Sequence, residues 1–442
     1  MPDCADLLWR QEIEQIPSGQ DLDPLARSAL VRLTNAVNLD WLQREARKPY
    51  RLGLSFLASP LHLVNGIRVG TATEVEGPQR FARMLLLAQD HLNKRMDFDF
   101  FRAATLVPEL AAFGTSLDQI PALGPEAERK TAALPTMTDE QVGSTIYEVL
   151  VGAAGVRVGL DLTMITEDRS RKVSDYCINN LHSVPAVLEC KRRRGLTEYE
   201  LTEAVQVERL YNCIRTEFCD RGVYGCLEAS FTVPVKRVPV EEFVKVTNDV
   251  VAHPDRESTT CAAWGALAFR SLPYRRSVGA TRLYSPEYLA EVFAWRTDQD
   301  EWDGILCEVE PPARIDVELF MRPFCLKWRS ESEEALVKKA RGIKSLWVDA
   351  IKQIPDGEMG FIYVAYPEGS RAAIADARTR QIMKELNEVW HRWSVRAPAT
   401  IISRLYARAL GVGYPDLIEN VLLAATEGEE LWLTKLPQRI FT

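Results

Sequence analysis

The sequence predicts a mixed α/β protein with a helical N-terminal region and a further α/β domain on its C-terminal side. Apolar residues recur at helical spacing through the first 135 positions. A helix, three strands, a helix and a strand are expected between 136 and 235, and a helix–strand–helix unit beyond 330. Because a domain takes roughly 100 to 200 residues, a chain of 442 residues has room for several. We expect three, over 1–135, 136–235 and 236–442.

The first region is expected to be helical and to carry no catalytic chemistry. Three segments have apolar residues at helical spacing, and connectors containing Pro or Gly separate them: 23–47, 79–94 and 100–113. The stretch 121–135, with Gly124 and Pro125 and a charged interior, is expected to be the boundary of the next domain.

The middle region changes character. Thr138 and Gln141 predict a capping box that begins a helix over 139–154, which Gly155 ends. Three strands should follow, then a helix begun by a second capping box at Thr197 and Glu200, then one more strand. The ranges expected for these later elements are 156–165, 173–178, 185–191, 197–219 and 223–235.

The C-terminal region repeats the alternation of helix and strand. A helix over 331–354 should break at Pro355-Asp356-Gly357, and an apolar strand over 360–366 and a helix over 371–393 should follow. We expect this region and the helical N-terminal one to regulate the protein or to bind a partner, which is another protein or a second copy of the chain.

Composition narrows the function classes. The chain has 54 Lys and Arg against 62 Asp and Glu, a formal charge of −8, which argues against a protein that coats nucleic acid through bulk charge. The first residues are acidic and do not resemble a signal peptide, and no apolar run reaches the roughly 20 residues of a membrane span. We therefore expect a cytoplasmic protein with no membrane partner, whose nine cysteines are reduced and mostly buried.

One constellation of residues indicates chemistry. Side chains alternate along a strand, so Glu189 and Lys191 must project from the same face of the strand 185–191. If the preceding strand pairs with it antiparallel, Asp175 can lie beside them. Two carboxylates and an ammonium would then converge at one edge of a small sheet.

Two fixed carboxylates suit Mg²⁺ or Mn²⁺, which prefer oxygen ligands and keep several waters. Such an ion stabilises charge on a phosphate under attack, and a neighbouring lysine can orient or help deprotonate the attacking water. The alternative is an exposed Glu-x-Lys pair on an amphipathic strand. Val187 and Leu188 favour the first interpretation, because they occupy both faces and so predict a buried strand.

Asp175 followed by Glu189-Cys190-Lys191 resembles the Asp-x(n)-(Asp/Glu)-x-Lys core of the PD-(D/E)XK nuclease superfamily, and the predicted order of elements is similar to its fold. The resemblance implies that Asp175 and Glu189 are metal ligands and Lys191 the catalytic lysine. It also implies catalytic roles for Glu148, on the preceding helix, and Gln206, on the following one. Solvated side chains explain those two equally well, since both stand off the apolar stripe of their helices.

The neighbourhood of these residues is locally basic. Between 166 and 194, seven Lys and Arg stand against four Asp and Glu. Lys172, Arg192, Arg193 and Arg194 are therefore expected to contact a nucleic-acid backbone, whose phosphates bind Lys and Arg irrespective of sequence. The alternative is a solubilising strand end.

These expectations combine into a metal-dependent nuclease that hydrolyses phosphodiester bonds, with DNA favoured over RNA. By resemblance, its architecture is that of restriction enzymes and antiviral effectors, some of which pair with a sensor such as a short Argonaute. The competing interpretation is a catalytically silent nuclease-like module that binds nucleic acid or protein within a complex.

Overall fold

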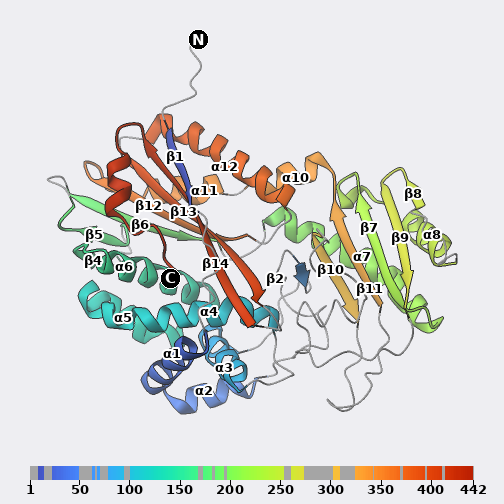
Figure 1. Ribbon diagram of the computed structural model, residues 1–442, viewed down its shortest axis with the longest axis horizontal. Coiled ribbons are helices and arrows are strands. Elements are labelled where there is room, and N and C mark those ends of the chain that lie inside the picture. The colour runs from blue at the N-terminus through green and yellow to red at the C-terminus, as the bar shows by residue number, and fades with distance from the viewer. Residues whose placement is uncertain are drawn as a thin grey trace, which may run out of the picture.

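Two seven-stranded sheets, each with parallel and antiparallel pairs, organise the chain in the computed structural model (Figure 1). The mixed α/β class predicted from the sequence is confirmed. The structure describes residues 8–13, 22–48, 62–64, 67–69, 78–93, 100–167, 173–181, 185–193, 197–252, 260–272, 302–308, 324–341, 343–368, 372–393, 396–410 and 414–441.

The first sheet has the order β1-β14-β13-β12-β6-β5-β4. A short antiparallel meander forms one side, and β12 continues the sheet parallel to β6, followed by parallel β13 and antiparallel β14 and β1. The strands are β1 (Leu8–Ile13), β4 (Leu162–Met164), β5 (Tyr176–Ile178), β6 (Ala186–Arg192), β12 (Met359–Pro367), β13 (Ala399–Leu410) and β14 (Tyr414–Thr426).

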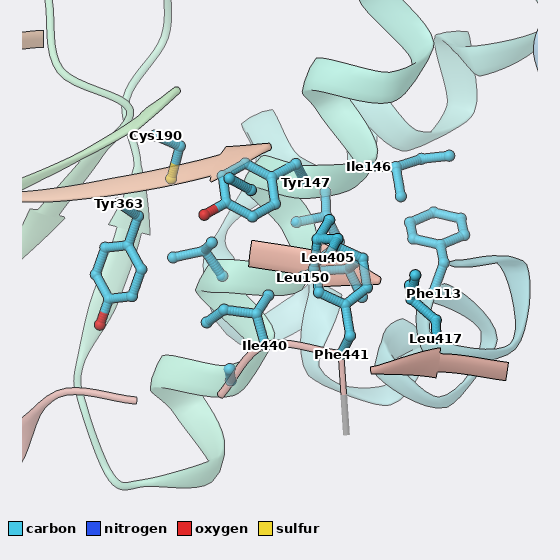
Figure 2. Close-up of a cluster of buried hydrophobic side chains, with 14 of the residues drawn as sticks. Phe113, Ile146, Tyr147, Leu150, Cys190, Tyr363, Leu405, Leu417, Ile440 and Phe441 are labelled. Carbon is cyan, nitrogen blue, oxygen red and sulfur yellow. The ribbon is translucent and has the colours of Figure 1, made fainter. Parts of the chain in front are cut away.

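Helices cover both faces of this sheet. On one face lie α1 (Leu22–Ala36), α2 (Leu39–Ala46), α3 (Arg80–Leu92), α4 (Phe100–Ser116), α5 (Pro125–Ala133) and α6 (Asp139–Arg157). Figure 2 shows part of the core on this side, where Tyr147 and Leu150 of α6 lie with Cys190, Tyr363 and Phe441. The opposite face is covered by α11 (Ile343–Ile351) and α12 (Ala372–Trp393), which pack on Val187 of β6. Strands buried on both faces explain the continuous apolar runs of β6 and β12.

Capping side chains fix where these helices begin. The capping box of α6 forms as predicted, with reciprocal bonds between Thr138 and Gln141. Thr197 and Glu200 form the second box, at α7 (Glu198–Asp220). The segment 23–47, expected as one helix, divides into α1 and α2 because Asn38 caps α2.

The second sheet has the order β2-β3-β10-β11-β7-β9-β8, and α7 and α8 (Val240–Val251) pack on one of its faces. The contact between α7 and the sheet buries Tyr211 and Phe218 of α7 against Phe324 of the sheet. The strands are β2 (His62–Val64), β3 (Ile67–Val69), β7 (Gly225–Phe231), β8 (Thr260–Ala262), β9 (Gly265–Ser271), β10 (Gly304–Glu308) and β11 (Phe324–Ser330). α10 (Glu333–Ala340) leads from β11 back toward the first sheet and contacts α7 and α12.

The strand expected over 223–235 does not share a sheet with the other strands expected in the domain 136–235. It forms β7, but β7 pairs with β9 and β11 in the second sheet, and β12 takes the place beside β6. Residues 135 and 235, the expected domain boundaries, therefore do not separate the two sheets. After β6, the next strand of the first sheet is β12, which begins only at Met359. The helix expected over 331–354 is also two helices, α10 and α11. Among the described helices, none has the length and apolar character needed to cross a lipid bilayer.

Candidate active site on strands β5 and β6

The pairing of β5 with β6 brings Asp175 opposite Glu189. The antiparallel register aligns Ile178 with Ala186 and Tyr176 with Leu188, so the next step along both strands aligns residues 175 and 189. Directly opposite residues in an antiparallel pair project from the same face. The antiparallel pairing of β5 with β6 therefore produces the juxtaposition that the sequence predicted.

Alternation along β6 decides which face carries the charges. Leu188 and Cys190 lie in the core beneath α6, whereas Val187 lies in the core beneath α11 and α12. Glu189 and Lys191 share the face of Val187. They therefore point toward the α11 side of the sheet.

Hydrogen bonds hold the three side chains in place. Lys191 Nζ donates to Glu189 Oε1 at 2.5 Å, and Asp175 Oδ2 accepts from the backbone N–H of Cys190 at 2.7 Å. Glu189 is fully buried, and its Oε2 atom has no hydrogen-bond partner among the described residues. An unsatisfied carboxylate oxygen in such a place is costly.

The pKa values of the cluster are displaced by burial and by mutual repulsion. Burial raises the pKa of Asp175 well above its ordinary value, and the charges of Glu189 and Glu148 raise it further. Burial also raises the pKa of Glu189 to about 7, although the adjacent ammonium of Lys191 opposes the shift. Burial alone would lower the pKa of Lys191, but the Glu189 carboxylate outweighs it and the net shift is upward. Lys191 is thus a cation at neutral pH, while Glu189 is near its midpoint.

Gln353, just beyond α11, is a member of the cluster that the sequence did not reveal. Its Oε1 accepts from Lys191 Nζ at 2.5 Å, and its Nε2 donates to the carbonyl of Val173 at 3.1 Å. It stands 162 positions from Lys191 in the sequence. No local pattern around a single glutamine could have indicated this contact.

Glu148 and Gln206 are placed differently from the central three residues. Glu148 lies on α6, beneath the other face of the sheet, and its carboxylate accepts from Lys130 Nζ at 3.0 Å. Its charge nevertheless reaches the site, since it raises the pKa of Asp175 and Glu189. Gln206 lies on α7, which packs on the second sheet, and we find no hydrogen bond from it to the cluster within the described residues.

The expectation that Arg192 and Arg193 form an exposed phosphate-binding edge is not met. Arg192 makes a bidentate pair with Glu109 of α4, at 2.7 and 2.9 Å, and only 5% of its side chain is exposed. Arg193 is mostly buried and lies 3.6 Å from Glu200. Lys172 and Arg194 lie outside the described residues. Of the seven cations between 166 and 194, the three that the structure describes, Lys191, Arg192 and Arg193, all lie against carboxylates of the fold.

The residues present fit a small hard cation. Mg²⁺ is usually bound through one or two carboxylates and keeps several waters, which agrees with the Asp175–Glu189 pair. Within the described part of the chain no cluster of three or more His, Cys, Asp or Glu side chains is arranged to hold a metal. The unsatisfied Oε2 of Glu189 is the atom that a cation would satisfy.

Comparison of the chain with known protein families, with curated proteins and with solved structures finds no match.

Proposed function

We propose that the protein is a metal-dependent nuclease that hydrolyses phosphodiester bonds in nucleic acid, with DNA favoured over RNA. The observation that carries the proposal is the convergence of Asp175, Glu189 and Lys191 on one face, with a buried Glu189 oxygen left unsatisfied. A buried carboxylate with a displaced pKa beside a cation is typical of catalytic sites.

In this proposal Asp175 and Glu189 hold Mg²⁺ or Mn²⁺. The ion, when bound, stabilises negative charge on the phosphate and makes water more acidic. Lys191 has three N–H donors, and two of them point to Glu189 and Gln353. Lys191 therefore acts as a donor that orients water or a phosphate oxygen. Glu189 must lose its proton before it can bind a cation.

A catalytically silent module is the second candidate, and the burial of Arg192 and Arg193 favours it. Side chains committed to Glu109 and Glu200 leave fewer cations for a phosphate backbone. In this case the nuclease-like unit would serve assembly with another protein. Control of an active enzyme by a partner, as in antiviral or restriction effectors, is also compatible with the burial of Arg192 and Arg193.

The decisive experiment incubates the protein with double-stranded DNA, single-stranded DNA and RNA in Mg²⁺ or Mn²⁺, with a chelator control. Glu189→Gln and Lys191→Met should each lower cleavage by about 100-fold or more, because each removes a group that acts at the reacting phosphate. Lys352→Met is the matched control, since Lys352 is an exposed lysine one position before Gln353.

Cleavage that survives in Lys191→Met would overturn the site assignment. Mn²⁺ should also raise the melting temperature of the wild type more than that of Glu189→Gln, because a cation that binds only the folded state stabilises it. A wild type that neither cuts nucleic acid nor responds to Mn²⁺ would favour the silent module.

A further inference from the structure

Gln353 joins the two halves of the candidate site through three hydrogen bonds. Its side chain accepts from Lys191 Nζ and donates to the carbonyl of Val173. Its backbone carbonyl accepts from Ser174 Oγ at 3.1 Å. Val173 and Ser174 immediately precede Asp175, so one residue contacts both the ammonium and the segment that carries the first carboxylate.

We propose that Gln353 is a positioning residue for phosphodiester hydrolysis, which holds the Lys191 ammonium and the Asp175 segment at a fixed separation. The inference rests on the proposed function and adds α11 to the machinery of the site. Residues that orient catalytic groups in this way commonly matter nearly as much as the groups themselves.

The chemistry of an amide suits this position better than that of a carboxylate. A neutral Oε1 accepts from Lys191 without adding a third negative charge beside Asp175 and Glu189, which already repel each other. The amide N–H₂ also donates to Val173, which a carboxylate cannot do. An apolar side chain of similar length would lose both bonds and leave the half-buried Lys191 with one partner fewer.

The test compares Gln353→Met and Gln353→Glu in cleavage assays. Gln353→Met should lower kcat by about 10- to 100-fold with KM changed little, because binding of substrate does not require the hydrogen bonds of Gln353. Gln353→Glu should lower kcat as well, because its carboxylate can accept from Lys191 but cannot donate to the carbonyl of Val173. Gln381→Met, on α12, is the matched control for loss of a half-buried glutamine.

A measurement independent of cleavage separates this inference from the proposed function. ¹³C NMR of labelled lysine at neutral pH, with the Lys191 signal identified through Lys191→Met, should show a changed chemical shift for Lys191 in Gln353→Met and none in Gln381→Met. A wild type that neither cleaves nucleic acid nor responds to Mn²⁺ overturns the proposed function. If the wild type is active and Gln353→Met retains its kcat, this inference alone is overturned. If Gln353→Met does not fold, an unchanged kcat and an unchanged Lys191 signal in Gln353→Glu overturn it.

Discussion

Glu189 is a fully buried carboxylate with one oxygen bonded to Lys191 and the other unsatisfied. Folding therefore favours its protonated form, and its pKa rises to about 7. A raised carboxyl pKa contributes stability that is complete below the ordinary value near 4.5 and is lost as the pH rises through about 7. The same residue that suits a cation thus weakens the fold at neutral and alkaline pH.

We expect Glu189→Gln to reduce the loss of stability between pH 5 and pH 8. The contribution of this one group is about 3 kcal/mol at most, and the parallel shift of Asp175 leaves part of the dependence in place. Urea unfolding of both proteins at the two pH values, without metal, measures the difference. Glu331→Gln is the control, because Glu331 is an exposed carboxylate that pairs with Arg329. An identical pH dependence in wild type and Glu189→Gln would show that Glu189 titrates normally.

The central residues could be predicted because their geometry is local. Asp175, Glu189 and Lys191 are positioned by strand alternation and one short turn, and both rules operate within a few residues. The contacts of Arg192 and Gln353 could not be predicted, because their partners, Glu109 and Lys191, lie 83 and 162 positions away in the sequence. A basic run has the same appearance in sequence whether it faces solvent or a buried carboxylate.

At the scale of elements, Glu109 ties α4 to β6. It is fully buried in mid-helix and accepts from Arg80 as well as from Arg192. Breaking a buried ion pair by removing one partner is strongly destabilising, since the remaining charge stays buried. This contact secures the strand that carries Glu189 and Lys191 against the helical layer.

Arg192→Met should therefore lower stability by about 3 to 5 kcal/mol and leave nucleic-acid affinity unchanged. Chemical denaturation measures the first effect, and a mobility-shift assay at a temperature where the variant is folded measures the second. Arg209→Met, an exposed arginine on α7, serves as the comparison for loss of charge. If Arg192→Met instead weakens the affinity for nucleic acid and leaves stability unaltered, Arg192 contacts nucleic acid, as the sequence predicted.

Sequence patterns predicted most elements but not their partners. The ranges of α3, α4, α6, α7 and α12 were close, because their apolar stripes and caps are intrinsic to each segment. β7 was expected as a strand of the domain 136–235, yet its apolar face, with Leu227 and Phe231, packs on α7, which covers the second sheet. The alternation of apolar and polar residues along a strand predicts which face is buried, but it does not predict which element covers that face.

At the scale of the whole molecule, a buried network of charges joins the two sheets. Arg378 of α12 bonds to Glu200 of α7 at 3.1 Å and to Glu368, beyond β12, at 2.6 Å. Lys339 of α10 bonds to Glu203 and Asp303 at 2.6 and 2.8 Å. Since α12 packs on the first sheet and α7 on the second, the bond between Arg378 and Glu200 crosses between the units.

Arg378→Met should uncouple the unfolding of the two units. Leaving Glu200 and Glu368 without this cation weakens the junction but alters neither apolar core, so calorimetry should resolve two transitions or a broadened one where the wild type has one. Arg380→Met, an exposed neighbour on the same helix, should unfold as the wild type does. A single sharp transition at lower temperature in Arg378→Met would instead show one cooperative unit.

The pairing of β6 with β12 also sets an order of events at the ribosome. Glu189 aligns with Ile362, and the entire second sheet except β2 and β3 is encoded between these strands. A chain that emerges from its N-terminal side makes the carboxylates and Lys191 long before it makes Gln353 and the strand that flanks them. Pairing across so long a separation is slow to form. The nascent protein consequently carries an incomplete site until late in its synthesis; under the proposed function, this delay would protect the nucleic acids around the ribosome from premature cleavage.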